Sequence, residues 1–409
     1  MKKNYCKSCY SKNLLKIIKI GKSPPCDEYL RKRDLKKKSK KYELDLYLCD
    51  KCKLIQINQI ISSKKIYKNY LIKTKHSIGT SEHFYKYAEN IHKFLNFKRN
   101  KRIVDIGCND GTFLSFCKKK GFKVMGIDPA SNIISDCRKK NIKLINDFFN
   151  LSLARKLKKK YSYDIITANN ILTNIPNIND FFKGVSFLLN DNGCFIFESF
   201  YGPDIIKNKY LDQINSVHVF YFSLKPLTYL LRTHNLKIIK VKKTKVGGGS
   251  IRIYSKKIKN MKYYSENMNV KNILEKEKKM GFHNYTKLKK INIEYIIYKK
   301  KIRKFLKNLK KNKNKIFGYG ASAGATTILH FLEMKNYIDF IIDDNPLRKN
   351  LYSPGYKIKV FSSSKIYSDK PNYIFIFAWR YHKNIIVKNK YFKRLGGKFI
   401  IPLPNLKII

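Results

Sequence analysis

The sequence predicts an α/β protein in three parts: a small cysteine-rich segment, a Rossmann-like sheet and a second α/β unit. The main observation is the stretch Ile103 to Leu114, IVDIGCNDGTFL, in which a β-branched run opens into glycines and then a helical pattern. A strand that ends in a glycine-rich turn and leads into a helix is how open α/β sheets build nucleotide sites. The pattern returns from Lys315 as KIFGYGASAGATTIL, and two C-x-x-C pairs precede both stretches.

The composition is that of a globular protein with an extreme charge. At 409 residues and 43% hydrophobic content, the chain is long enough for two or three domains. The 88 Lys and Arg against 28 Asp and Glu give a formal charge of +60. The lysines are spread through every segment, which favours a solvated face over an aromatic-studded nucleic-acid surface. We find no long apolar run and no signal peptide, so we expect a cytoplasmic protein with no membrane and no specific nucleic-acid partner.

Four of the nine cysteines form two knuckles, Cys6-Lys-Ser-Cys9 and Cys49-Asp-Lys-Cys52. Four thiolates in two such turns can surround one tetrahedral ion, and zinc is the natural choice because four sulfur ligands close the site. The alternatives are a redox pair or four unrelated cysteines. The other five cysteines are isolated, and the odd total argues against a disulfide framework. We therefore expect a structural zinc site within a first domain, residues 1–75.

The glycine-rich turn of the central stretch has the pattern D-x-G-x-N-D-G, which argues against a dinucleotide. Asp105 ends its strand, and Gly107 and Gly111 allow the backbone to approach a ligand closely. Asp128 ends the next strand, 21 residues after Gly107, and an acidic residue about 20 residues on binds ribose hydroxyls. Acids at both strand ends suit S-adenosylmethionine (SAM), which has a positive centre and a free ribose. The alternative is that the glycines are ordinary turn residues of another α/β domain.

Strands and helices alternate through a central domain, residues 76–255. A helical pattern from Tyr67 to about Asn96 precedes expected strands near Ile103–Gly107, Lys123–Asp128, Ile142–Asn146, Tyr163–Asn169 and Cys194–Ser199. Ligands of open α/β sheets bind at the carboxyl ends of the strands. The expected cofactor-binding residues are therefore Asp105, Gly107, Asn109, Asp110, Gly111, Asp128, Asp147, Phe148 and Asn169. Asp147 and Phe148 could flank an adenine, although core packing is the alternative for Phe148.

Two further stretches of the central domain carry candidate residues. The run Asp212 to Leu224, DQINSVHVFYFSL, contains His218, the one group there whose ordinary pKa is near neutrality, and therefore the candidate general base. The run Gly247 to Tyr254, GGGSIRIY, predicts a mobile or closely approached loop before a strand. Its Arg252 could pair with a phosphate, and a surface strand arginine is the alternative.

The last part, residues 256–409, is expected to be a helical linker and a second α/β unit. From Lys256 to Lys313 the chain is highly charged with scattered apolar positions, which predicts bridging helices. Strands are expected from Lys315 and at Ile338–Asp343, Tyr373–Trp379 and Lys398–Pro402. The glycines after the first of these strands either cradle a ligand or only permit tight strand–helix packing.

The order of these motifs resembles that of sugar C-methyltransferases, which use SAM to methylate a keto-deoxy sugar on a nucleoside diphosphate. The resemblance covers Cys6 to Pro404 and rests on the four cysteines, D-x-G-x-N-D-G, G-I-D-P-A, G-G-S-x-R-x-Y, G-Y-G-A-x-A and P-x-P. It implies a class I methyltransferase sheet flanked by a zinc-binding domain and a C-terminal Rossmann-like domain. It also implies zinc on Cys6, Cys9, Cys49 and Cys52, and a nucleotide-sugar site at Gly249, Ser250, Arg252, Tyr319, Gly320 and Ala321.

The catalytic part of the resemblance is incomplete. The family's Y-H-E-H run, which deprotonates the carbon beside the keto group, reads Asn215-Ser216-Val217-His218 here, so only the last histidine remains. Asn174 and Gly247 stand where the family has histidines, and Ile72 stands where it has the second tyrosine of a Y-x-Y element. Tyr70 and His83 match the family's pattern, and the resemblance therefore implies that they are catalytic candidates together with His218.

These departures leave the methylated atom open. Carbon methylation requires a base and stabilisation of an enolate, whereas oxygen methylation can proceed with one base and an aligned methyl group. The sequence predicts a SAM-dependent methyltransferase acting on a nucleotide-linked keto-deoxy sugar, in cell-surface glycan or natural-product sugar biosynthesis. The alternatives are an O- or N-methyltransferase on a related sugar and a non-catalytic zinc-stabilised binding protein.

Overall fold

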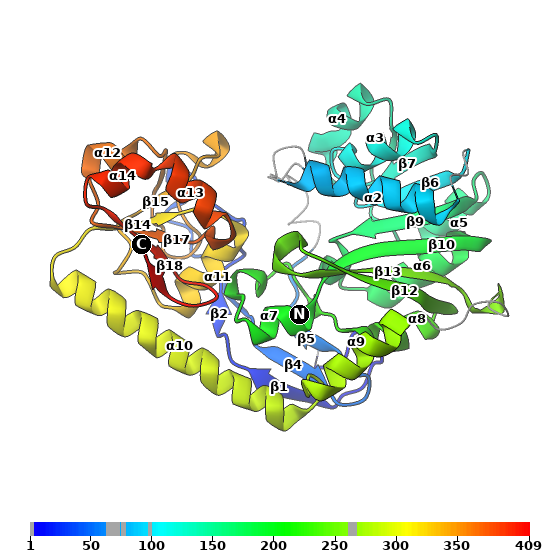
Figure 1. Ribbon diagram of the computed structural model, residues 1–409, viewed down its shortest axis with the longest axis horizontal. Helices are drawn as coiled ribbons and strands as arrows, with labels where there is room; N and C mark the ends of the chain where they lie inside the picture. Colours follow the sequence, from blue (N-terminus) through cyan, green and yellow to red (C-terminus); the bar gives the residue numbers. More distant parts are fainter. Residues whose placement is uncertain (1–3, 63–73, 75–78, 97–99, 261–267) are drawn as a thin grey trace.

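The structure, a computed structural model, describes residues 4–62, 74, 79–96, 100–260 and 268–409. Its central sheet has seven strands in the order β12-β13-β10-β9-β6-β7-β8 (Figure 1). The strands from β10 to β8 run parallel, and β13 and β12 add to the β10 edge antiparallel. The bounds are β6 (Arg102–Ile106), β7 (Lys123–Ile127), β8 (Lys143–Ile145), β9 (Tyr163–Asn169), β10 (Leu189–Phe200), β12 (Leu236–Thr244) and β13 (Ser250–Lys257).

The five strands expected in the central domain are all present. Because each is a β-branched or aromatic run bounded by turn residues, its bounds follow closely from the sequence. Only β10 is longer than expected, since it begins at Leu189 rather than Cys194. The edge strand β12 was not predicted; its lysines alternate with apolar residues, a composition that also protects an exposed sheet edge.

Helices cover both faces of the central sheet because successive strand residues point to opposite sides. On one face, α2 and α3 pack over Ile103 and Ile165; on the other, α5 and α6 pack over Val104 and Ile166. The bounds are α2 (Thr80–Phe94), α3 (Thr112–Lys119), α4 (Ile134–Lys139), α5 (Leu151–Lys158), α6 (Ile178–Leu188), α7 (Gly202–Lys207) and α8 (Leu224–Arg232). The helix expected over 67–96 is confirmed for α2, while Tyr70 and Ile72 lie outside the described residues.

The first part of the chain forms a four-stranded antiparallel sheet in the order β1-β4-β5-β11. Its strands are β1 (Leu14–Ile18), β4 (Leu46–Cys49), β5 (Ile55–Ile57) and β11 (Phe220–Tyr221), and a small ribbon joins β2 (Lys22–Ser23) to β3 (Tyr42–Glu43). β11 comes from the central part of the sequence, directly after His218. The first sheet is therefore completed by the segment that carries the candidate base.

The last part contains a six-stranded sheet in the order β16-β15-β14-β17-β18-β19, parallel except for β19. Its strands are β14 (Ile316–Tyr319), β15 (Phe340–Ile342), β16 (Val360–Phe361), β17 (Tyr373–Ile376), β18 (Lys398–Ile401) and β19 (Lys407–Ile408). Its helices are α11 (Ala323–Phe331), α12 (Lys365–Asp369), α13 (His382–Lys388) and α14 (Lys390–Arg394). The four strands expected here are confirmed.

The bridging helices expected before the last sheet are α9 (Met268–Lys279) and the long α10 (Tyr285–Lys311). α10 runs below the last part in the view of Figure 1, toward the first sheet, and it makes hydrogen bonds with all three parts. Asn292 accepts a hydrogen bond from Lys19 N, Tyr295 donates to Ile206 O, and Tyr298 donates to Pro402 O. One buried apolar cluster also continues through the three parts. The domain limits at residues 75 and 255 stay predictions.

In the described part of the chain, no helix combines the length and the apolar character that crossing a bilayer requires.

Candidate functional site

The candidate cofactor site lies where the strand order of the central sheet reverses. The chain passes from β6 to β7 and β8 on one side, then returns to β9 and β10 on the other. At such a switch point the loops after the two central strands separate and leave a crevice at their carboxyl ends. The loop after β6 contains the glycine motif, and Asn169 ends β9.

The loop after β6 has the conformation that its glycines were expected to allow. Gly107, Asn109 and Gly111 have φ values of +75°, +50° and +72°, a region that is strained for most side chains. A Cβ on Gly107 would lie 2.5 Å from Ile171 Cγ2, so this position must be glycine. Gly126 in β7 has an ordinary φ but little space, because a Cβ there would lie 2.5 Å from the Cys108 sulfur.

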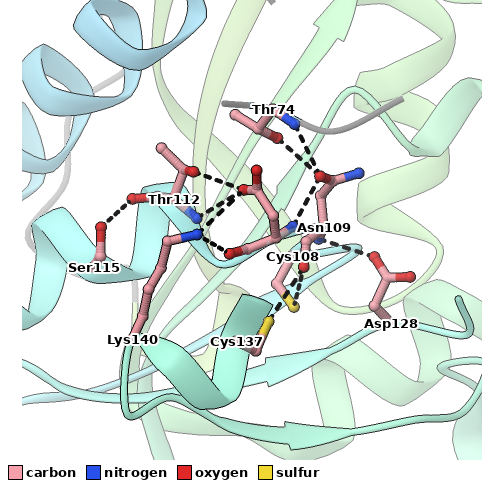
Figure 2. Close-up of polar contacts among 9 residues, drawn as sticks. Thr74, Cys108, Asn109, Thr112, Ser115, Asp128, Cys137 and Lys140 are labelled. Atoms are coloured by element: carbon pink, nitrogen blue, oxygen red, sulfur yellow. Dashed lines mark hydrogen bonds and ion pairs between the residues drawn. The ribbon is translucent and has the colours of Figure 1, made fainter. Parts of the chain in front are cut away.

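Asn109 and Asp128 hold the loop in place (Figure 2). Asp128 Oδ2 accepts a hydrogen bond from Asn109 N at 2.9 Å, and its Oδ1 accepts one from Ala130 N at 3.0 Å. The Asn109 side-chain oxygen accepts hydrogen bonds from Thr74 N and Thr74 Oγ1, at 3.0 and 3.2 Å. Thr74 therefore contacts the loop after β6 directly, a contact that the sequence did not predict.

Asp110 connects the loop after β6 to the start of α3. Its carboxylate is fully buried and accepts hydrogen bonds from the backbone N and the Oγ1 of Thr112, at 3.1 and 2.6 Å, at the start of α3. Lys140 donates to the Asp110 carbonyl oxygen (Figure 2). These contacts fix the start of the helix, so the Asp110 carboxylate shapes the site by holding the backbone of Thr112, and Lys140 holds the Asp110 carbonyl.

Asp105 is the buried carboxylate of the site. It is 2% exposed, and its Oδ1 accepts hydrogen bonds from Thr167 Oγ1 at 2.7 Å and from Asn169 Nδ2 at 3.2 Å. Burial raises the pKa of Asp105 to about 7, and burial also raises the pKa of Asp128. Both carboxylates would be stabilised as anions by a positive or hydroxylated ligand.

The residues present fit SAM. Among the described residues, the buried side-chain oxygens of Asn169 and Asn170 have no hydrogen-bond partner, and buried polar atoms without partners are uncommon unless a ligand or water serves them. Two carboxylates and two free amide oxygens thus meet at the carboxyl ends of β6, β7 and β9. Asp147 is exposed and Phe148 half-buried in the loop after β8, which Asn146 ties to Asp128 O. Their contact with an adenine stays a prediction.

His83 lies in a buried charged cluster that includes Glu198, which sequence reasoning missed. Glu198 is fully buried at the end of β10 and binds Arg252 Nε and Nη2 at 3.0 and 2.9 Å. His83 Nε2 lies 2.9 Å from Glu198 Oε1, and the Arg252 guanidinium stacks 3.3 Å from the Tyr87 ring centroid. Burial alone would raise the pKa of Glu198, but the His83 hydrogen bond and the Arg252 charge outweigh it and lower the pKa.

This cluster corrects the expectation for Arg252. The side chain is neither a surface arginine nor free for a phosphate, because two of its nitrogens bind Glu198 and the residue is 2% exposed. A buried carboxylate nearly always requires such a partner. The available sequence signal was Glu198 itself, a lone acid within the apolar strand CFIFESF.

His218 lies just before β11 with one ring nitrogen engaged. Its Nδ1 lies 2.7 Å from Gln213 O, so Nδ1 carries the proton and donates it to that carbonyl. Asn215 Oδ1 accepts hydrogen bonds from Val217 N and His218 N, which fixes the turn. The ring also packs 5.3 Å from that of Phe200 at the end of β10. In this tautomer Nε2 carries the lone pair of the imidazole.

The triple-glycine loop lies close to His218. Gly247, Gly248 and Gly249 have φ values of +60°, +90° and +138°, so the loop requires glycine. A Cβ on Gly247 would lie 2.2 Å from the Phe200 ring, the ring that packs on His218. Ser250 starts β13 and donates to Val246 O at 3.0 Å.

The glycines of the last α/β unit permit close packing between its strands and loops, and a ligand cradle there stays a prediction. A Cβ on Gly320 would lie 2.6 Å from the Ala378 Cβ. Ala321 is fully buried, and its N–H donates to Asp343 Oδ2 at 2.5 Å. The Tyr319 hydroxyl donates to Asp344 at 2.8 Å. The substrate-binding expectation for Tyr319, Gly320 and Ala321 stays a prediction, and the structure shows that each of them already has a contact within the fold.

The four knuckle cysteines come together as predicted. Their Sγ atoms all lie within 4.8 Å of one another, with Cys6–Cys52 and Cys9–Cys49 both at 3.5 Å. A tetrahedron with Zn–S bonds of about 2.3 Å has corners about 3.8 Å apart, so the set fits one zinc ion. Both knuckles also close in the same way, since Tyr10 N donates to Cys6 O and Lys53 N to Cys49 O, each at 2.9 Å.

A cavity of about 980 Å³ lies elsewhere, between α8 and the segment from α9 to α10. Its lining includes Lys225, Tyr229, Arg232 and Lys278, and none of the predicted site residues. We place the site at the strand ends because buried carboxylates, amide oxygens and strained glycines converge there. The lining of this cavity combines exposed basic side chains with Leu274, Glu275 and His283.

Three family models match the chain in sequence order. Residues 6–67 match a model described as "putative zinc binding domain", residues 80–241 one described as "methyltransferase domain", and residues 245–404 one described as "C-methyltransferase C-terminal domain". The chain is also 24% identical over 406 residues to the C-methyltransferase NovU of Streptomyces niveus, which covers 99% of this chain and 96% of that one.

Solved structures give partial matches to the chain. Magnesium protoporphyrin IX methyltransferase from Synechocystis PCC 6803 is 12% identical with a TM-score of 0.35, covering 44% of this chain and 83% of that one. A SAM-dependent methyltransferase from Clostridium acetobutylicum is 16% identical with a TM-score of 0.34, covering 43% and 91%. The family models, not these likenesses, carry the assignment. They confirm the expected class I methyltransferase fold: the chain is a SAM-dependent methyltransferase whose N-terminal part matches a zinc-binding model and whose C-terminal part matches a C-methyltransferase model.

Proposed function

We propose that this enzyme methylates a carbon next to the keto group of a nucleotide-linked deoxy sugar, with His218 as the general base. The observation that carries the proposal is the 2.7 Å contact between His218 Nδ1 and Gln213 O, which is shorter than the 3.4 Å contact between Nδ1 and Asn215 Nδ2 and involves a carbonyl oxygen that can only accept. The hydrogen bond from Nδ1 to Gln213 O places the lone pair on Nε2, as a base requires. The motif resemblance over the whole chain supports a nucleotide sugar as the substrate class.

The protonation state of His218 also suits a base. Burial lowers its pKa below the ordinary value, and the Gln213 hydrogen bond only partly opposes this. The imidazole is therefore neutral at pH 7 and ready to accept a proton. As the pH falls through this lowered pKa, the ring becomes protonated and methyl transfer should stop.

The proposed reaction is balanced as follows. His218 Nε2 takes the proton from the carbon next to the carbonyl, and the electrons of that C–H bond form an enolate. The enolate carbon forms a bond to the methyl carbon while the sulfur–methyl bond breaks, leaving S-adenosylhomocysteine. SAM supplies an electrophilic methyl group when bound. The proton on His218 then passes to solvent.

Other residues take supporting roles in this proposal. We assign Asp128 to the ribose hydroxyls of SAM, because its carboxylate ends β7 and has remaining lone pairs. Asp105 and Asn169 face the positively charged end of the cofactor. His83 is held against Glu198 and Arg252, so we propose that it positions the site. Tyr70 stays a catalytic prediction because it lies outside the described residues.

The test is methyl transfer from labelled SAM to a panel of nucleotide-linked keto sugars, together with exchange of the α-hydrogen in D₂O. Wild-type protein should label a sugar carbon and catalyse the exchange. His218→Gln should lose about 100-fold or more of both activities, a typical contribution of a general base, while binding SAM normally. Label transfer without α-hydrogen exchange would contradict the carbon assignment, and full activity of His218→Gln would exclude it as the base.

A further inference from the structure

The α8–α9 cavity is the space of about 980 Å³ between α8 and the segment from α9 to α10. Its volume is in the range of small-molecule sites, and it lies apart from the strand ends that hold the candidate cofactor site. Its lining includes four cations, Lys225, Arg232, Lys278 and Lys287, against one acid, Glu275. A concave surface lined mainly by one sign of charge attracts ligands of the opposite sign, so this cavity favours an anion.

A buried carboxylate holds the two walls of the α8–α9 cavity together. Glu277 is fully buried in α9, and its Oε1 accepts hydrogen bonds from Leu224 N at 2.6 Å and from the Tyr201 hydroxyl at 2.9 Å. Its Oε2 accepts a hydrogen bond from Lys225 N at 3.2 Å. Glu277 therefore caps the first turn of α8 and fixes α9 beside it (Figure 1). Because contacts within the fold fix both walls, a ligand would bind with little rearrangement.

Three lysines from three helices lie at the end of the cavity where α9 turns into α10. Lys225 belongs to the first turn of α8, Lys278 to the last turn of α9 and Lys287 to the first turn of α10. The Lys287 side chain lies across Gly281, because a Cβ on that glycine would clash with its Cδ and would lie 3.2 Å from its Nζ. Within the described ranges, none of the three lysines has an ion-pair partner, so their charges remain available to a ligand.

His283 adds a hydrogen-bonding group to the same end of the cavity. Ser223 Oγ lies 2.8 Å from its Nε2, which ties the turn before α10 to the start of α8. The side chain is 11% exposed, and among the described residues its Nδ1 has no hydrogen-bond partner. Burial and the nearby charges of Lys225 and Lys53 lower the pKa of His283 to about 4, so the imidazole is neutral at pH 7. When Ser223 donates to Nε2, Nδ1 carries the proton and can donate it to an anion.

Apolar side chains line the cavity next to its charged end. Tyr229 of α8 and Leu274 of α9 are half-buried lining residues. Tyr229 follows Lys225 by four residues, and Leu274 precedes Lys278 by four residues, so each wall carries a cation and an apolar side chain one helical turn apart. One turn is a rise of about 6 Å. A ligand with an anionic end and an apolar part beside it would therefore contact both kinds of group on both walls.

We infer that the α8–α9 cavity is a second ligand site, which binds a phosphate monoester with an apolar or aromatic part. The phosphate oxygens accept hydrogen bonds from the three lysines and from His283 Nδ1, and the apolar part packs between Tyr229 and Leu274. A phosphate monoester carries about two negative charges at pH 7, whereas a carboxylate carries one, so three lysines favour the phosphate. The site is independent of the proposed function because it shares no residue with it.

Calorimetry with phenyl phosphate tests the inference. The protein is first saturated with S-adenosylhomocysteine, which occupies the cofactor site, and the titration is run in moderate salt because so basic a chain also attracts anions diffusely. We expect saturable binding of one phenyl phosphate per chain. Inorganic phosphate, which lacks the apolar part, should bind at least tenfold more weakly. No saturable binding of phenyl phosphate, or equal affinity for the two anions, would overturn the inference.

Lys278→Glu is the test variant and Lys279→Glu the matched control. Both reverse one charge in the last turn of α9, and both side chains are exposed, but only Lys278 lines the cavity. We expect Lys278→Glu to weaken phenyl phosphate binding at least tenfold and Lys279→Glu to weaken it less than twofold. Equal weakening in the two variants would show that diffuse charge binds the anion, and it would overturn the inference.

Thr228→Trp fills the cavity without changing the charge of the chain. Thr228 is a half-buried lining residue of α8, so an indole there would occupy the space beside Tyr229. We expect at least a tenfold loss of phenyl phosphate affinity, while SAM binding and zinc content stay at the wild-type level and show that the fold is intact. Unchanged affinity would overturn the inference. Should Thr228→Trp fail to fold, the comparison of Lys278→Glu with Lys279→Glu still decides.

Two further titrations distinguish the source of the phosphate. Adenosine monophosphate carries an aromatic base beside its phosphate, and hexyl phosphate carries an alkyl chain. Tighter binding of adenosine monophosphate would identify a nucleotide, and tighter binding of hexyl phosphate would identify an alkyl phosphate. Either result supports the inference when Lys278→Glu weakens that binding, and contradicts it when the variant binds as the wild type does. None of these measurements uses methyl transfer, so they stand or fail apart from the proposed function.

Discussion

Replacing Asp105 with asparagine tests whether burial raises the pKa of this carboxyl in β6, so that a bound cation would favour its ionised form. Asp105 is 2% exposed, and burial raises its pKa to about 7, whereas the pKa of an aspartate in an unfolded chain is about 3.9. Because the folded-state pKa is the higher of the two, the stability that Asp105 contributes is fully present below about pH 4. It is lost as the pH rises through the folded-state pKa, which is about 7.

The size of the effect follows from the two pKa values. Between about pH 5.5 and about pH 8, the free energy of unfolding of the wild type should fall by about 2 kcal/mol relative to Asp105→Asn, because only the wild type must ionise a buried group. The asparagine oxygen can still accept the hydrogen bonds from Thr167 and Asn169. Urea unfolding without SAM measures the difference.

Asp147→Asn is the control for this test, and proton release on SAM binding is a second measurement. Asp147→Asn removes an exposed carboxylate near the same sheet edge and should leave the pH profile of stability unchanged. SAM brings positive charge to Asp105, so its binding to the wild type should release a proton near pH 7, which calorimetry in two buffers of different ionisation enthalpy detects. A stability difference between wild type and Asp105→Asn that does not change with pH would refute the reasoning.

Three further perturbations have defined outcomes. Cys49→Ser should lose bound zinc in metal analysis and unfold at lower urea, because three thiolates cannot close the tetrahedral site; a full zinc equivalent would contradict this. Glu198→Gln should lower the free energy of unfolding by about 3–5 kcal/mol, since it leaves Arg252 charged, buried and unpaired, and a loss below about 1 kcal/mol would exclude that account. Gly126→Ala should weaken SAM binding by pushing Cys108 and its loop, and adding Cys108→Ala should restore it, because the clash is with the Cys108 sulfur at 2.5 Å.

Much of the candidate site was predictable because its signals are local. The residues of the cofactor loop lie within one strand–turn–helix unit, so their spacing and glycines indicate the geometry directly. The zinc knuckles are equally local, since each is a four-residue turn. The candidate base His218 was found because histidine alone has an ordinary pKa near 7.

Other parts of the site depend on contacts between segments that are distant in the sequence. Glu198 and Arg252 are 54 residues apart and meet as cross-strand neighbours of β10 and β13. Asp212 and Arg380 are 168 residues apart and meet where two sheets adjoin. A period or a motif in a single sequence does not contain such pairings, because they depend on strand order and on which faces pack together.

The sequence by itself determined the five parallel strands of the central sheet, four strands of the last sheet, the helix α2, the glycine loop and the two knuckles, because turn chemistry and hydrophobic period act over a few residues. It also determined the class of enzyme, through the order of its motifs. Only the tertiary structure decided which partners the charged and polar side chains have. It paired Arg252 with a buried acid, engaged Tyr319 and Ala321 within their own fold, and paired Arg380 with Asp212. These roles depend on which groups share a low-dielectric interior, where each buried charge or donor requires a partner.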